Sequence, residues 1–387
     1  MKEKIPLTLL GAHAAAYAMK QINPDVVAAY PITPQTPIME KFSEYVADGL
    51  VNSEMILVES EHSAMSACVG ASAAGARVMT ATSSVGLALM TEIVFIASSM
   101  RLPIVMNVVN RALSGNINIH GDHSDSMLVR DSGWVQLYSE NAQEVYENNI
   151  FAIKLAEKYN VPVMVMQDGF ITSHALENVF VLKDEDVKSL IGENKRENTL
   201  LNSNLTIGPL DLFDYYFEHK YQQIELFETI RKEFNKEAEQ FSKETGYGMY
   251  SIENYMVNDA EFVLMCMNST AGIVKEVVDE LREQGYKVGC LKFRLFRPFP
   301  TEDLRNIIKF SNVKIIGVLD RAISVGSSGP LNLEVKNALF GYFDGKIYNF
   351  IYGLGGRDVT KDQIKNAFMM LIENKGLEEL NFLGLRK

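Results

Sequence analysis

The chain has 387 residues, of which 47% are hydrophobic and 22% charged, the balance of a folded globular protein rather than a disordered one. This length exceeds what one hydrophobic core usually supports, so two domains are expected. The formal net charge of −12 argues against nucleic acid or an anionic membrane surface as a partner. The sequence contains no run of roughly 18 apolar residues, so no membrane-spanning helix is predicted.

The first residues only weakly resemble a signal peptide, because Glu3 and His13 interrupt the apolar stretch and a strand pattern follows at Val26. We therefore expect no such peptide. The three cysteines (Cys68, Cys266 and Cys290) form no CxxC pair, so this chain alone is not expected to build a structural zinc site or an iron–sulfur cluster. This cysteine usage fits a reducing, cytoplasmic location.

From residue 5 to about residue 170, apolar strand-like runs alternate with helical patterns, which predicts a parallel sheet covered by helices on both faces. The predicted strands are Val26–Ala29, Ile56–Val58, Arg77–Ala81, Ile104–Val109, Trp134–Tyr138 and Val161–Met166. The predicted helices lie at about 11–21, 37–47, 61–75, 86–100 and 142–159.

A stiff loop follows the first of these strands. Its three prolines, Pro31, Pro34 and Pro37, each fix φ and bias the preceding residue toward an extended conformation. The segment is therefore neither a helix nor an interior strand. Thr33 lies within it, at the carboxyl end of a strand, where open α/β sheets bind their ligands. A turn that merely ends the strand explains the prolines equally well.

Charged residues also follow the next strands. Glu61 comes shortly after the second strand and Arg111 directly after the fourth. Charges at the ends of buried strands are costly without partners, so these two residues and Thr33 are interpreted as a site. Arg111 suits a substrate carboxylate, which its guanidinium can bind in a bidentate manner. The alternative is a structural ion pair between Glu61 and Arg111.

Two further segments admit a ligand-binding and a structural interpretation. The hydroxyl-rich turn 82–86 suits a polar ligand at a helix N-terminus, although helix capping explains it more simply. The run 120–125 crowds His120, Asp122, His123 and Asp125 together. Their spacing matches no known zinc motif, so a turn in which Asp and Ser side chains bond the local backbone is preferred to a metal site.

Residues 183 to about 258 are polar and charged, with apolar residues at the three-and-four spacing of a long amphipathic helix. Strand patterns return at Phe262–Met267, Val288–Phe293, Val313–Leu319 and Ile347–Tyr352, separated by helical patterns at about 270–285, 301–309, 331–340 and 360–373. The expected organisation is a first α/β domain at 1–190, a helical connector at 191–258 and a smaller α/β domain at 259–387. The turns at 268–272 and 353–356 are attributed mainly to helix capping.

Five motifs occur in order in the first domain: Tyr30-Pro31-Ile32-Thr33-Pro34, Glu59-Ser60-Glu61-His62, Asn110-Arg111-Ala112, Gly121-Asp122-His123-Ser124-Asp125 and Asp168-Gly169-Phe170-Ile171-Thr172-Ser173-His174. Together with Leu295-Phe296-Arg297-Pro298-Phe299-Pro300 and Val318-Leu319-Asp320-Arg321, they resemble the alpha chain of pyruvate:ferredoxin oxidoreductase and its 2-oxoacid relatives. The resemblance covers nearly the whole chain.

This resemblance implies a pyrimidine-binding-type thiamine diphosphate domain followed by a transketolase C-terminal-like domain. In such multichain enzymes, partner chains of beta, gamma and delta type carry the diphosphate–Mg²⁺ motif and the [4Fe-4S] clusters. The sequence agrees, because it has neither a Gly-Asp-Gly motif followed by Asn-Asn nor cluster-binding cysteines. The implied reaction converts pyruvate and coenzyme A to acetyl-CoA and CO₂, with electrons passed to ferredoxin.

The resemblance also implies roles for individual residues. Glu61 would hydrogen-bond the aminopyrimidine ring of thiamine diphosphate and act in catalysis, Arg111 would hold the substrate carboxylate, and Thr33 would hydrogen-bond the substrate beside it. Glu59 is the replacement candidate if Glu61 is structural. Because the residues around these motifs vary among relatives, 2-oxoisovalerate or another 2-oxoacid is an alternative substrate. A self-contained transketolase-like thiamine enzyme and a non-catalytic scaffold subunit are the alternatives in function.

Overall fold

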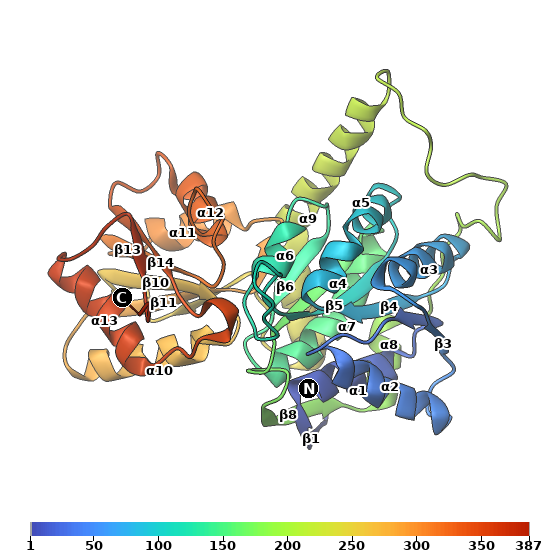
Figure 1. The fold of residues 1–387 in the computed structure, drawn as a ribbon, viewed down its shortest axis with the longest axis horizontal. Helices are drawn as coiled ribbons and strands as arrows, with labels where there is room; N and C mark the ends of the chain where they lie inside the picture. The colour runs from blue at the N-terminus through green and yellow to red at the C-terminus, as the bar shows by residue number, and fades with distance from the viewer. Residues whose placement is uncertain (1, 387) are drawn as a thin grey trace.

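The computed structural model describes residues 2–386, which form two α/β domains joined by a long helix (Figure 1). The N-terminal domain is built on a seven-stranded sheet of order β12-β6-β7-β5-β4-β2-β3, in which only β12 runs antiparallel to its neighbour. Its strands are β2 (Val26–Ala29), β3 (Glu54–Leu57), β4 (Val78–Thr82), β5 (Ile104–Asn110), β6 (Val135–Tyr138), β7 (Val163–Asp168) and β12 (Leu295–Arg297). The parallel sheet predicted from the alternating pattern is confirmed.

Helices cover both faces of this sheet, which explains why β4, β5 and β7 are buried along their whole length. One core contains apolar residues of α1 (Gly11–Ile22), α2 (Thr36–Ala47) and α7 (Ala142–Tyr159). The other contains those of α3 (Glu61–Ala74), α4 (Ser84–Leu89), α5 (Thr91–Ser99) and the short α6 (Ser124–Leu128). The single helix predicted at 86–100 is wrong, because the chain leaves helical geometry at Met90 between α4 and α5.

A second, two-stranded sheet was not predicted from the sequence. It pairs β1 (Lys4–Leu10) with β8 (Leu176–Leu182) in antiparallel register, from Lys4 opposite Leu182 to Leu10 opposite Leu176. β8 leads into α8 (Asp184–Ile191), which packs on α1.

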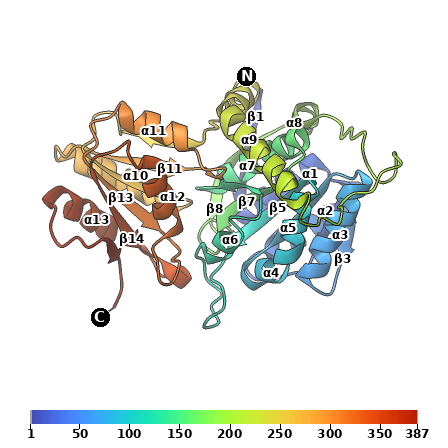
Figure 2. The ribbon, with the colours of Figure 1, turned by 90° about the horizontal axis from the view of Figure 1, so that it is seen from above.

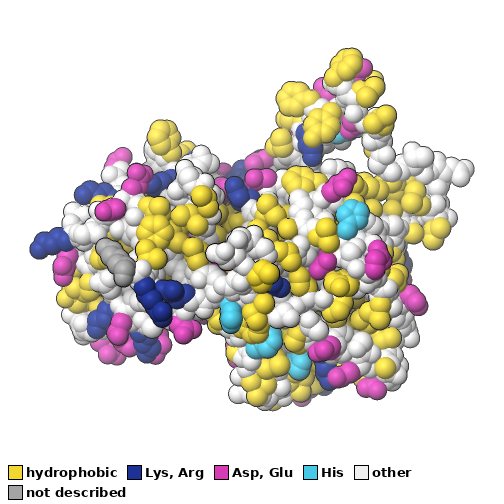
Figure 3. All heavy atoms as spheres, in the orientation of Figure 1, with side chains coloured by type: hydrophobic (Ala, Val, Ile, Leu, Met, Phe, Trp, Pro, Cys, Tyr) yellow, Lys and Arg dark blue, Asp and Glu magenta, His cyan; other side chains and the backbone are white. Residues whose placement is uncertain are grey.

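The long helix α9 (Tyr216–Thr245) confirms the amphipathic pattern of the connector. Its second half buries Ile230, Phe234 and Phe241 against the N-terminal domain, while its first turns and the preceding loop extend away from the body (Figures 1 and 2). Hydrophobic side chains gather at this projecting end (Figure 3), where Phe213 is 90% and Phe217 75% exposed.

The C-terminal domain has a six-stranded sheet of order β15-β14-β13-β10-β11-β9, parallel except for β9. Its strands are β9 (Ile252–Tyr255), β10 (Phe262–Met267), β11 (Val288–Phe293), β13 (Ile315–Asp320), β14 (Lys346–Ile351) and β15 (Leu380–Phe382). Its helices are α10 (Thr270–Glu283), α11 (Thr301–Lys309), α12 (Pro330–Leu339), α13 (Lys361–Glu373) and the 3₁₀ turn η1 (Leu354–Gly356). The predicted second, smaller α/β domain is confirmed.

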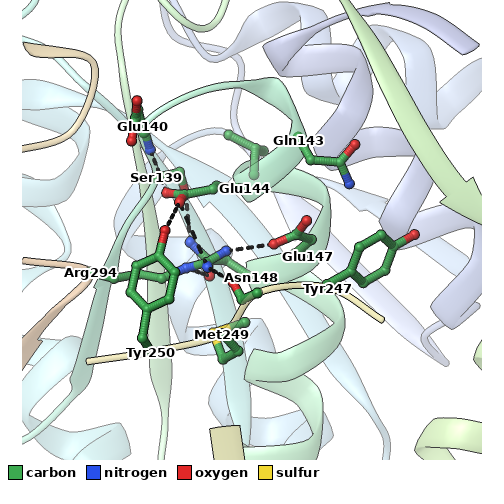
Figure 4. A network of polar contacts seen from close by, with 12 residues as sticks. Ser139, Glu140, Gln143, Glu144, Glu147, Asn148, Tyr247, Met249, Tyr250 and Arg294 are labelled. Carbon is green, nitrogen blue, oxygen red and sulfur yellow. Dashed lines mark hydrogen bonds and ion pairs between the residues drawn. The ribbon is translucent and has the colours of Figure 1, made fainter. Parts of the chain in front are cut away.

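The two domains meet through buried charges as well as through β12. Arg294, fully buried between β11 and β12, donates to Asn148 at 2.7 Å and to Glu147 at 2.9 Å, both on α7 (Figure 4). Glu144, one turn earlier, accepts from Tyr250 at 3.0 Å (Figure 4). The Arg294–Glu147 ion pair neutralises charges that would otherwise be costly to bury, and the other two hydrogen bonds satisfy the remaining polar atoms. No helix within residues 2–386 has both the length and the apolar character needed to cross a bilayer.

Candidate active site

One edge of the seven-stranded sheet collects the polar residues singled out by the sequence. Strands β3, β2, β4, β5 and β7 are successive parallel neighbours, so their carboxyl ends meet at the same edge. Thr33 follows β2, Glu61 follows β3 and Arg111 follows β5. The topology thus places all three on one side of the domain.

Arg111 contacts the Thr33 loop directly. Its Nη1 donates to the backbone carbonyl of Thr33 at 2.9 Å, and its Nε donates to the carbonyl of Asn118 at 2.9 Å. The Arg111 residue is only 8% exposed, and burial lowers its pKa while the Asp125 carboxylate opposes that change. Within residues 2–386, Arg111 forms no ion pair with any carboxylate, so the proposed Glu61–Arg111 pair is absent. The guanidinium is therefore a buried positive charge that can accept an anionic ligand.

The Thr33 side chain is exposed at this edge, and its hydroxyl makes no hydrogen bond to any other described residue. The loop is fixed by its own backbone, since Gln35 N donates to the carbonyl of Ile32 at 2.7 Å. Thr33 thus presents an unpartnered hydroxyl on a residue whose backbone carbonyl the Arg111 guanidinium holds.

Glu61 begins α3, whose N-cap Ser60 accepts a hydrogen bond from Ser63 N at 3.2 Å. The residue as a whole is only 7% exposed, and its side chain packs on Gly86. A Cβ at Gly86 would lie 2.6 Å from Glu61 Oε1 and 2.7 Å from Thr82 Oγ1. The absence of a side chain at residue 86 therefore makes room for both polar groups.

Neither of these two groups has a partner in the described part of the chain. The Glu61 carboxylate makes no hydrogen bond or ion pair there, and the buried Thr82 hydroxyl is also unpartnered. Buried polar groups are nearly always paired, so the Thr82 hydroxyl, with the unpaired Glu61 carboxylate beside it, fits a ligand that brings hydrogen-bonding groups to both. The amino and ring nitrogens of an aminopyrimidine meet that requirement.

Glu59, the replacement candidate, lies outside this arrangement. It is exposed and accepts a hydrogen bond from the Ser63 hydroxyl at the start of α3. That hydrogen bond keeps the pKa of Glu59 below its usual value. Its contact is therefore local to the helix start.

Asp125 holds the ends of two strands together and was not identified as a site residue from the sequence. Its carboxylate accepts from Ser84 N and Arg111 N at 2.9 Å each, and from Asn110 Nδ2 at 2.8 Å. Complete burial raises its pKa to about 6 despite these hydrogen bonds. Asp125 thus fixes the backbone from which the Arg111 side chain departs.

The hydroxyl-rich turn after β4 does not cap α4, contrary to the simpler interpretation of the sequence. Ser83 Oγ donates to the carbonyl of Val109 at 2.7 Å, and Ser84 Oγ donates to the carbonyl of Ala112 at 2.5 Å. The hydroxyls instead bind the end of β5, because that backbone has carbonyls free where the strands separate.

The run 120–125 forms the expected turn, with Asp122 Oδ1 accepting from Ser124 N at 3.0 Å. No group of three or more His, Cys, Asp or Glu side chains suited to a metal ion occurs in the part of the chain that the structure describes. His123 instead contacts Asp168, with 2.9 Å between Nε2 and Oδ1.

Asp168, at the end of β7, makes several polar contacts with the C-terminal domain. It accepts from Ser269 N at 3.1 Å and Asn268 Nδ2 at 3.2 Å, and Arg321 Nη1 lies 3.3 Å away. Burial by itself raises the pKa of Asp168, but Arg321 and His123 together hold it well below its usual value. The turn at 268–272 thus joins the domains rather than capping α10. The one sign of this interdomain contact in the sequence is that Asp168 and Arg321 occur in two of the motifs that carry the family resemblance.

Comparison with protein families agrees with this geometry. Residues 17–239 match the family described as "Pyruvate flavodoxin/ferredoxin oxidoreductase, thiamine diP-bdg". Residues 260–364 match "Pyruvate:ferredoxin oxidoreductase core domain II". The two matched ranges correspond to the domains of the seven-stranded and six-stranded sheets.

Individual relatives resemble the chain over nearly its full length. "Pyruvate synthase subunit PorA" of Thermotoga maritima is 55% identical, covering 100% of this chain and 99% of that protein. The protein of the same name from Methanocaldococcus jannaschii is 48% identical, with 92% of each chain covered. "Ketoisovalerate oxidoreductase subunit VorA" of Pyrococcus abyssi is 46% identical, covering 92% of this chain and 90% of the relative.

A solved structure has the same fold. It is a 2-oxoglutarate:ferredoxin oxidoreductase from Magnetococcus marinus, with a TM-score of 0.72 and 22% sequence identity, and the alignment covers 96% of this chain and 66% of that one. The fold class and the family predicted from the ordered motifs are confirmed. The chain belongs to the pyruvate flavodoxin/ferredoxin oxidoreductase family and carries its thiamine diphosphate-binding domain.

Proposed function

We propose that this chain is the alpha subunit of a pyruvate synthase, which oxidatively decarboxylates pyruvate with coenzyme A to acetyl-CoA and CO₂ and passes the electrons to ferredoxin. The observation that carries the proposal is the buried Arg111 guanidinium, which has no carboxylate partner among residues 2–386 and lies against the Thr33 loop. The relative at 55% identity, named as a pyruvate synthase subunit, supports pyruvate as the substrate. The ketoisovalerate relative, at 46%, makes 2-oxoisovalerate the second candidate.

Arg111 binds the substrate carboxylate in this proposal. With Nη1 and Nε held by the carbonyls of Thr33 and Asn118, the Nη2 edge is left for the ligand. The Thr33 hydroxyl donates a hydrogen bond to the substrate beside that carboxylate. A guanidinium fixed in this way orients a 2-oxoacid at little further cost in conformational entropy.

Glu61 holds the aminopyrimidine ring of thiamine diphosphate, with the Thr82 hydroxyl beside it. When bound, the cofactor supplies the electron sink for decarboxylation. The Glu61 carboxylate accepts a hydrogen bond from the ring and favours the tautomer that can take up and release a proton. Its close packing on Gly86 fixes the place from which the carboxylate makes that hydrogen bond.

The rest of the active site is proposed to come from partner chains. Apolar side chains surround the candidate edge and are exposed in this chain: Tyr30 at 37%, Leu57 at 75%, Val85 at 37% and Leu89 at 53%. Exposed apolar patches of this kind are typical of surfaces covered by another protein. The beta-type subunit would bring the diphosphate–Mg²⁺ motif, and the gamma- and delta-type subunits the [4Fe-4S] clusters.

The domain organisation proposed for this role is a pyrimidine-binding domain at 1–190, a connector at 191–258 and a transketolase C-terminal-like domain at 259–387. The buried free thiols Cys68, Cys266 and Cys290 fit the proposed cytoplasmic location. Coenzyme A serves as the co-substrate that takes the acyl group.

The decisive experiment reconstitutes the complex with its partner chains and compares the native protein with Glu61→Gln. Pyruvate turnover of the variant should fall by at least roughly 100-fold, because a neutral amide cannot act as the proton acceptor that the Glu61 carboxylate is proposed to be. Faster turnover of 2-oxoisovalerate than of pyruvate would select the second candidate. Unchanged turnover in Glu61→Gln would indicate a scaffold subunit, and turnover by the isolated chain would indicate a self-contained transketolase-like enzyme.

A further inference from the structure

Asn118, in the loop between Arg111 and Gly121, contacts residues of both domains. The carbonyl of Asn118 accepts from Arg111 Nε at 2.9 Å, and the amide Nδ2 of Asn118 donates to the carbonyl of Gly355 in the C-terminal domain at 2.9 Å. Asn118 Oδ1 accepts from His120 N at 2.7 Å, which sets the side-chain orientation. The loop projects beside the C-terminal domain (Figure 2).

The turn Gly353–Gly356 approaches this loop more closely than side chains would allow. Gly355 has φ +60°, and a Cβ there would lie 2.4 Å from Asn118 Nδ2. Gly356 has φ +77°, and a Cβ there would lie 2.2 Å from the Cβ of His120. Both glycines are therefore required by backbone conformation and by the contact itself. Helix capping, the explanation expected from the sequence, does not account for this turn.

The turn is itself fixed from both sides. Arg321 Nε donates to the carbonyl of Gly353 at 3.3 Å, and Gly355 N donates to Asp122 Oδ2 at 3.0 Å. Arg321 also pairs with Asp168 at the end of β7. The C-terminal domain thus offers a rigid surface against which the loop is held.

We propose that Asn118 is a positioning residue, through which the Gly353–Gly356 turn of the C-terminal domain fixes the orientation of the Arg111 guanidinium. This inference rests on the proposed function, in which Arg111 binds the 2-oxoacid carboxylate. Without the Asn118–Gly355 contact, the loop is free to move at its exposed tip, where Ile117 is 87% exposed. Arg111 then loses the fixed acceptor of its Nε and presents its fork in several orientations.

The test measures KM and kcat for pyruvate, together with thiamine diphosphate affinity by calorimetry, in the reconstituted complex. Asn118→Ala and Gly355→Ala should each raise KM on the order of tenfold, because each disturbs a hydrogen-bonded support of a charged group. Both should leave kcat and cofactor affinity within about twofold, since Glu61 is untouched. Gly376→Ala is the matched control, because Gly376 has φ +64° and no neighbouring atom of the described residues lies within 4 Å of its Cβ position.

The double variant Asn118→Ala/Gly355→Ala distinguishes positioning from general damage. Within residues 2–386, the atoms close to a Gly355 Cβ belong to Asn118, so removing that side chain should leave the second substitution only the effect of its positive φ, which Gly376→Ala measures. The inference is overturned if KM is unchanged in Asn118→Ala, if the two effects add, or if Gly376→Ala raises KM equally. Arg111→Lys in the same assay distinguishes the proposed function from the positioning role of Asn118. An unchanged KM in Arg111→Lys refutes substrate binding by Arg111. A raised KM in Arg111→Lys, with an unchanged KM in Asn118→Ala, refutes only the positioning role.

Discussion

Arg321 and Asp168 form a buried ion pair between the two domains, with 3.3 Å from Nη1 to Oδ2 and side-chain exposures of 1% and 0%. The two residues are far apart in sequence: Asp168 ends β7 and Arg321 directly follows β13. His123, on the loop that follows Arg111, also contacts Asp168 at 2.9 Å. The candidate site and the domain interface therefore share one set of polar contacts.

Substituting Asp168→Asn should lower the free energy of unfolding by about 3–5 kcal/mol, because Arg321 would remain buried without its counter-charge. Thermal or denaturant unfolding of the assembled enzyme measures this. Because the folded-state pKa of Asp168 is depressed, its contribution is present above the ordinary value of 3.8 and is lost only as the pH falls below it. The exposed pair Lys336–Glu379 provides the control: Glu379→Gln should leave the unfolding midpoint unchanged. An equally small effect for both variants would contradict a structural role for Asp168.

Gly86→Ala should reduce turnover strongly without unfolding the chain. The added Cβ would lie 2.6 Å from Glu61 Oε1, so the carboxylate must move away from its place beside Thr82. We expect kcat to fall by roughly 10–100-fold, since a misplaced acid–base group loses most of its effect. Gly70→Ala on α3, the helix that Glu61 begins, is the control, because no neighbouring side chain within residues 2–386 lies within 4 Å of its Cβ position. Equal turnover in the two variants would mean that the Glu61 carboxylate need not occupy this place.

Much of this arrangement was predictable from the sequence, and the part that was not has a physical reason. The buried strands β4 and β5 are apolar runs and were predicted, and the proline loop and Arg111 follow strands as expected. The β1–β8 pair was missed because no residue of β1 is fully buried and the two strands lie about 170 residues apart in the chain. The break at Met90 has no glycine or proline to mark it.

Contacts between segments that are far apart in the chain could not be predicted from the sequence. Asn118 and Gly355 are 237 residues apart, and nothing in either segment specifies the other. The sequence patterns could identify Gly353–Gly356 as a turn, but only tertiary packing reveals that its glycines make room for a side chain of the other domain. Asp125 was likewise recognised as part of a turn, whereas its role in joining β4 to β5 depends on the strand order.

Arg111→Lys should impair the use of pyruvate far more than the binding of the cofactor. The planar guanidinium of Arg111 donates to the carbonyls of Thr33 and Asn118 and has donors left for a carboxylate. A lysine ammonium is a compact point charge and cannot reproduce this geometry. We expect kcat/KM for pyruvate to fall by roughly 100-fold, with thiamine diphosphate affinity nearly unchanged. Steady-state kinetics and cofactor titration of the reconstituted complex measure the two quantities. If cofactor affinity falls as steeply as substrate use, Arg111 does not act mainly on the substrate.

The stability of the C-terminal domain should depend on pH through Asp320. Its carboxylate, at the end of β13, accepts from Leu331 N at 2.8 Å, Asn332 N at 3.0 Å and Asn349 Nδ2 at 2.9 Å. Complete burial outweighs these hydrogen bonds and raises the pKa from 3.8 to about 7. Because the folded-state pKa is raised, the stabilisation is complete below 3.8 and is lost as the pH rises through about 7.

Thermal unfolding between these two pH values tests this dependence. The native protein should unfold at lower temperature as the pH rises, and Asp320→Asn should remove part of that slope, since an amide does not ionise. Asp344→Asn, at an exposed carboxylate of the same domain, should leave the slope unchanged. A slope that is identical in the native protein and in Asp320→Asn would show that Asp320 binds no extra proton in the folded state. In that case, its three hydrogen bonds stabilise the ionised carboxylate more strongly than burial opposes it.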